Sequence, residues 1–162
     1  MKAFTTEAQR TRRLLCVSLC LCGETFFALA FAGCRAEPQH GVTIARNGKA
    51  TARVLVTMVG TATKETGPAE TIKSFGEVYA FSPDVFAVRR DQPTEIIFWN
   101  LQADDEHDLM LTDPGNHVLL TTKFAPLSKT TYVMTFHDEG VFPFYCTVHQ
   151  PAMSGQIIVT SQ

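Results

Sequence analysis

From Val42 onward, short runs rich in β-branched and aromatic residues alternate with groups of turn residues. No apolar repeat with a period of 3.6 residues is long enough for a major helix, so the pattern predicts strands. The predicted strands are 42–46, 52–61, 72–80, 85–89, 94–101, 107–111, 117–122, 130–136, 141–146 and 155–160.

Turn residues separate these runs, and Asp113-Pro114-Gly115-Asn116 is the strongest such group. About eight to ten strands at spacings of roughly 8 to 12 residues are typical of a β-sandwich. We therefore expect an all-β fold, a β-sandwich with Greek-key connections.

The predicted strand 141–146 has two distinct faces. Because side chains alternate along a strand, Phe142, Phe144 and Cys146 share one face. That face is strongly apolar, so it should pack in the core. Cys146 then ends the strand, and a loop leads from it to the last predicted strand.

The amino-terminal segment has the pattern of an export signal. Four basic residues against one acidic residue in positions 1–13 precede an apolar run that extends to about Ala32. The run is interrupted by Gly23-Glu24-Thr25, which disfavours a transmembrane anchor. Its end, Phe31-Ala32-Gly33-Cys34, resembles the lipobox of bacterial lipoproteins, in which the cysteine is acylated; Ala30-Phe31-Ala32 also fits an ordinary signal-peptidase site.

This pattern divides the chain into an export signal of the lipoprotein type (1–33), a tether (34–41) and one domain (42–162). The expected location is the periplasm, or the periplasmic face of a membrane with a lipid on Cys34 as the only attachment. A length of 162 residues suits one domain.

The composition narrows the possible functions. A hydrophobic fraction of 45% argues against a disordered protein. The chain has 14 basic and 16 acidic residues, and losing four bases and two acids with residues 1–33 leaves 10 and 14. A mildly acidic domain offers no basic surface, so we expect no nucleic-acid partner.

The cysteines point to a special role for one of them. Cys16, Cys20 and Cys22 fall in the signal and Cys34 at its end, so the domain contains only Cys146. A lone thiol in an oxidising compartment is a chemical liability unless it is buried, occupied or catalytic.

Cys146 opens a loop with further soft donors, His149 and Met153. Taken singly, a free cysteine is most often a buried apolar residue and a methionine most often belongs to the core. Taken together, a thiolate, an imidazole and a thioether suit copper, and a His₂Cys site with a weak axial Met is typical of blue-copper electron transfer. His107 is the natural second histidine, because two connections at one end of a sandwich can converge.

Residues 72–162 resemble the cupredoxin family of small blue-copper proteins, such as plastocyanin, amicyanin and azurin. The resemblance is carried by Phe81-Ser82-Pro83, Phe98-Trp99-Asn100, His107, the segment 140–146 and Met153-Ser154-Gly155. It implies one copper ion per chain, with His107, Cys146 and His149 as equatorial ligands and Met153 as axial ligand.

Other residues would support these ligands or compete with them. The predicted supporting residues are Asn100, which ends the preceding strand, and Asp108, where many family members have Asn. Asp108 can accept a hydrogen bond but has no amide donor to offer. Glu106 is an alternative oxygen ligand, as in the red-copper (nitrosocyanin-like) relatives, while a single cysteine excludes a dinuclear copper site.

The resemblance implies a one-electron carrier, not an enzyme, that meets transient redox protein partners through the surface around His149. Copper carriage or buffering is the second hypothesis, although no Met-rich or His-rich run supports it. A copper nitrite reductase or oxidase would need a second copper site and normally a second domain, which the length disfavours.

Overall fold

The computed structural model describes residues 40–161. The predicted export signal, most of the tether and Cys34 lie outside the described residues. Among the described residues, no helix is long and apolar enough to cross a membrane.

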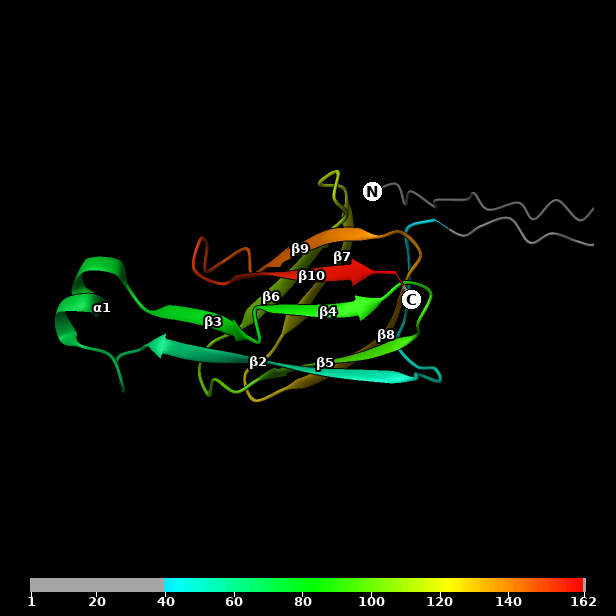
Figure 1. Cartoon of the computed structure of the whole chain (residues 1–162). Helices are drawn as coiled ribbons and strands as arrows, with labels where there is room; N and C mark the ends of the chain where they lie inside the picture. Colours follow the sequence, from blue (N-terminus) through cyan, green and yellow to red (C-terminus); the bar gives the residue numbers. More distant parts are fainter. Residues whose placement is uncertain (1–39, 162) are drawn as a thin grey trace, which may run out of the picture. The chain divides into compact units, whose positions relative to one another are not determined.

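Within residues 40–161, ten strands form two five-stranded sheets that pack as the layers of a sandwich (Figure 1). The first sheet has the order β1-β8-β5-β2-β3 and the second β4-β10-β9-β6-β7. Both sheets are mixed, because β2 runs parallel to β5 and β4 parallel to β10. The strands are β1 (Val42–Ala45), β2 (Ala52–Ala62), β3 (Val78–Ser82), β4 (Val85–Arg89), β5 (Thr94–Asn100), β6 (His107–Thr112), β7 (Val118–Phe124), β8 (Lys129–Phe136), β9 (Gly140–Tyr145) and β10 (Ser154–Thr160).

The core lies between the sheets and is built from alternate strand positions. On β9, Phe142 and Phe144 are 1% exposed and Cys146 just beyond is fully buried, which confirms the predicted apolar face. Met58 and Met134 are also fully buried and belong to this core. Met110 is only half-buried, and its sulfur accepts a hydrogen bond from the Tyr145 hydroxyl.

One predicted strand is partly wrong. The segment 72–80 does not run as one strand: α1 (Ala69–Phe75) comes first, and β3 begins only at Val78. Gly76 ends the helix with a φ of 75°, which glycine adopts at little cost, and its N–H bonds to the carbonyl of Ile72. The helix has only seven residues and none of them is buried, so it leaves no long apolar repeat in the sequence.

The sheet topology places two ligand candidates at one end of the sandwich. Strands β6 and β9 are antiparallel neighbours, with Met110 opposite Tyr145. The start of one antiparallel strand lies beside the end of the other, so His107 at the start of β6 comes close to Cys146 after β9. The expected convergence of these two connections is confirmed.

Candidate metal centre

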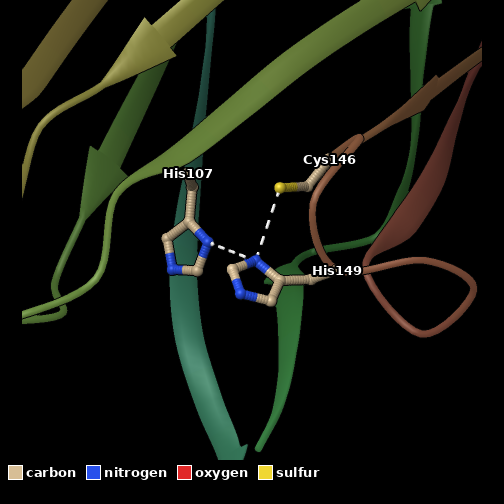
Figure 2. A group of neighbouring side chains, drawn as sticks. All are labelled: His107, Cys146 and His149. Atoms are coloured by element: carbon tan, nitrogen blue, oxygen red, sulfur yellow. Dashed lines mark hydrogen bonds between the residues drawn. The ribbon is translucent and has the colours of Figure 1, made fainter.

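Three donor atoms converge at this end of the second sheet. The Nδ1 atoms of His107 and His149 lie 3.0 Å apart, and the Cys146 sulfur lies 3.5 Å from Nδ1 of His149. All three donor atoms fall within 4.8 Å of one another, and Figure 2 shows the two imidazoles meeting through these nitrogens beside the sulfur. A group of this kind could hold one metal ion.

The donors differ in their access to solvent. His107 and Cys146 are fully buried, whereas His149 is partly exposed. Burial, and then the neighbouring His149, lowers the pKa of His107 to about 4. The imidazole is therefore neutral at physiological pH, which is the form that binds metals.

Burial raises the pKa of the Cys146 thiol, and backbone N–H groups of Asp108, Val148 and His149 act in the opposite direction. The N–H of Asp108 reaches the sulfur at 3.5 Å. A thiolate at Cys146 would thus accept hydrogen bonds from these backbone N–H groups but would not be solvated by water. A nearby cation would complete its stabilisation, because a coordinating thiol is deprotonated outright.

The loop from Cys146 to Met153 is closed by its own backbone. The N–H of Cys146 donates to the Met153 carbonyl, and the N–H of Met153 donates to the His149 carbonyl, both at 3.0 Å. The Gln150 amide adds bonds to the carbonyls of Cys146 and Met153. Met153 is fully buried at the loop's end. Its role as axial ligand stays a prediction.

Asp108 links the two segments that carry the ligands. Its carboxylate accepts the backbone N–H of Thr147 at 2.5 Å and, through its second oxygen, the Thr147 hydroxyl. Asp108 follows His107, and Thr147 follows Cys146, so these bonds fix one ligand-bearing segment against the other. The carboxylate acts here only as an acceptor, the role that its chemistry allows.

Asn100 organises the loop that precedes His107. Its side-chain amide donates to the carbonyls of Asp105, Phe124 and Ala125 at 2.8 to 3.2 Å. Its Oδ1 accepts the N–H of Gln102 at 3.0 Å. The side chain is 1% exposed and stabilises the loop from within.

Glu106 does not join the donor group. Its carboxylate pairs with Lys123 at 3.0 Å, and its side chain is 56% exposed. This arrangement disfavours Glu106 as an oxygen ligand, and with it a red-copper centre built on this residue.

Tyr79 belongs to the site but was not among the residues predicted from the sequence. This residue of β3 is 1% exposed, and its ring centroid lies 4.9 Å from that of His107 and 4.6 Å from that of His149. Its hydroxyl donates to the carboxylate of Asp105. The sequence placed Tyr79 in a strand, but no spacing relates that strand to the ligand loop.

A groove of about 380 Å³ lies beside His149. Its walls come from the ligand loop and from the segment 75–79 that joins α1 to β3. Phe75 on one side and Val148 on the other are 79% and 68% exposed. The ring of His149 therefore borders a groove that Val148, Pro151 and Ala152 line together with the polar Glu77 and Gln150.

The donor set suits copper. One sulfur and two imidazole nitrogens are the soft and borderline ligands that copper accepts in both of its common oxidation states. The facing Nδ1 atoms would be the ligand atoms, and Nε2 of His107 is buried with no hydrogen-bond partner in the described part of the chain. The residues present therefore fit a mononuclear site.

No protein-family model matches the sequence, and no curated protein is significantly similar to it. Solved structures do match. A reduced amicyanin variant aligns with 74% of this chain and 99% of its own length, at 17% identity and a TM-score of 0.46. Auracyanin A, a blue copper protein from Chloroflexus aurantiacus, aligns with 67% of this chain and 100% of its own, at 14% identity and a TM-score of 0.47.

A copper-containing nitrite reductase from Thermus scotoductus aligns with 69% of this chain but 31% of its own length, at 12% identity and a TM-score of 0.49. All three TM-scores are below 0.5, so both the fold and what this chain binds must follow from its own residues. The described residues thus form the two-sheet β-sandwich that the resemblance to cupredoxins predicts, with the His, Cys, His group at one end of it.

Proposed function

We propose that this protein is a one-electron carrier with a single copper ion held by His107, Cys146 and His149, with Met153 as a weak axial ligand. The observation that carries the proposal is the convergence of two imidazole nitrogens and one buried sulfur within 4.8 Å. When bound, copper supplies a one-electron redox couple.

The chain's contribution is to hold the donors in one arrangement. The backbone bonds across the Cys146–Met153 loop and the link from Asp108 to Thr147 restrict movement of the ligands. Both elements are stabilised by bonds that need no metal. A site that moves little between oxidation states exchanges electrons at low reorganisation cost, which is what a carrier requires.

Electrons would enter and leave through His149. It is the partly exposed member of the donor group, and its ring is flanked by Val148 and the groove that ends at Phe75. A small apolar surface of this kind suits brief encounters with redox partners. Four protein donors would leave no position for a substrate, so we propose electron transfer and not catalytic turnover.

Copper carriage is less well supported. Handing a metal on requires donors that an acceptor can reach, whereas His107 and Cys146 are both fully buried. We further propose, from the sequence pattern, that residues 1–33 direct export and that Cys34 carries a lipid. The carrier would then work in the periplasm or at its membrane face.

The test is copper(II) titration of the purified protein, followed by visible absorption and electron paramagnetic resonance. We expect one equivalent to give an intense blue colour that bleaches on reduction and is absent from Cys146→Ala. Met134→Leu, a buried sulfur outside the site, is the matched control and should remain blue. A wild-type protein that stays colourless and binds no copper would refute the proposal.

A further inference from the structure

His107 is held in an unusual way. Metal-binding histidines almost always donate a hydrogen bond from the second ring nitrogen, and this bond fixes the ring's orientation. Nε2 of His107 is buried and has no hydrogen-bond partner among the described residues. Once Nδ1 binds a metal and gives up its bond to His149, no hydrogen bond to the described residues would be left to orient this imidazole.

The ring of Tyr79 occupies the position needed for that task. It meets His107 edge to face, at a centroid distance of 4.9 Å and an interplanar angle of 65°. It also contacts His149 at 4.6 Å and 55°. One side chain from β3, in the first sheet, thus touches both imidazoles that belong to the second sheet's end.

Tyr79 is itself fixed at its far end. Its hydroxyl donates to the carboxylate of Asp105, and the backbone carbonyl of Asp105 accepts a bond from the buried amide of Asn100 at 2.8 Å. The ring is thereby attached to the loop that leads into His107. Rotation of the tyrosine would break this bond and open a gap beside both histidines.

We propose that Tyr79 is a positioning residue of the metal centre, whose ring sets the orientation of His107 and His149 and whose hydroxyl is anchored by Asp105. This inference rests on the proposed function, because it concerns the same two ligands. It adds that the first sheet supplies part of the site, although none of the proposed ligands lies on that sheet.

The experiment compares Tyr79→Leu, which removes the ring, with Tyr79→Phe, which keeps it and removes only the hydroxyl. Tyr132→Leu is the matched control, since Tyr132 is 2% exposed and its ring contacts Arg46, which is not part of the site. Copper(II) affinity and the electron paramagnetic resonance spectrum are measured for each. The imidazole signals of the metal-free proteins are followed by NMR.

We expect Tyr79→Leu to weaken copper binding about 10- to 100-fold and to change the resonance parameters. Tyr79→Phe keeps the ring but loses the Asp105 anchor, so its effects should fall between wild type and Tyr79→Leu. Tyr132→Leu should lose stability without changing the spectrum. In metal-free Tyr79→Leu, the imidazole signals of both histidines should broaden or split.

A Tyr79→Leu protein with wild-type spectrum and wild-type imidazole signals would overturn the inference. So would a Tyr132→Leu protein with the same spectral change, because the effect would then be general loosening of the core. The NMR comparison needs no metal. If the wild-type protein bound no copper, the proposed function would fail while the positioning role of Tyr79 would still be decided.

Discussion

The bond between Asp108 and Thr147 gives a prediction that needs no metal. Asp108 is 9% exposed, and its carboxylate accepts two hydrogen bonds from Thr147. Each bond to a charged acceptor contributes about 1.5 kcal/mol at the low end of the usual range. Because Thr147 is exposed and water can replace part of the interaction, we expect Asp108→Ala to lower the free energy of unfolding by about 2 kcal/mol.

A double-mutant cycle isolates the contact. Thr147→Val removes only the hydroxyl bond and should cost about 1 kcal/mol in the wild-type background. It should cost close to nothing once Asp108 is alanine, so the coupling energy should be about 1 kcal/mol. Urea unfolding of the metal-free proteins, followed by circular dichroism, gives the free energy of unfolding of the wild type, the two single variants and the double variant.

The control is Thr57→Val, which removes an exposed strand hydroxyl bonded to the Ser82 carbonyl. It should show no coupling to Asp108. If the Asp108 and Thr147 substitutions proved additive, the bond would not hold the two ligand segments together, and the account of how the site is kept in shape would be refuted.

Three further predictions concern the site. Met153→Leu should bind copper but raise the reduction potential measured by voltammetry, because the weak axial donor is lost while the buried loop end keeps an apolar side chain; an unchanged potential would refute the axial role. The metal-free protein should lose stability as the pH falls from about 6.5 toward 4: His107 has a folded pKa of about 4, below its unfolded value, so the unfolded chain takes up a proton that the folded imidazole does not. In His107→Gln, the free energy of unfolding from urea titrations should change less between about pH 6.5 and 4. An unaltered pH dependence would show that His107 is not its cause. Val148→Lys should slow electron self-exchange, measured by NMR line broadening of mixed oxidation states, whereas Val118→Lys, at an exposed position of β7, should not; equal rates for both would remove the apolar surface from the mechanism.

Much of the sandwich was predictable because its strands carry a clear alternation. The face of Phe142, Phe144 and Cys146 was predicted from spacing alone, and all three side chains are buried. The loop after Cys146 was equally informative, since three candidate donors lie close together in the sequence. Both features depend on residues that are close together in the chain, so they can be predicted from the sequence alone.

The features that were missed depend on the tertiary arrangement. Helix α1 has no buried face, so nothing in the hydrophobic pattern distinguishes it from a loop or a strand. Tyr79 reaches the histidines only because β3 and the ligand loop meet at the same end of two different sheets. The pairing of Glu106 with Lys123 likewise depends on where β7 returns beside β6.

The division of the donors between a local loop and a distant strand also bears on how the chain folds. Cys146 and His149 are near neighbours in the sequence, so an unfolded chain could already hold a metal through these two. The Asp108 N–H bond to the Cys146 sulfur spans 38 residues, and His107 joins the group only when β6 and β9 have paired. His107 contributes binding free energy only in the folded state. The metal therefore binds the folded state more tightly than the unfolded chain and stabilises it by that difference. The affinity for the metal thus reports whether β6 and β9 have paired, because only the paired strands bring His107 to the other two donors.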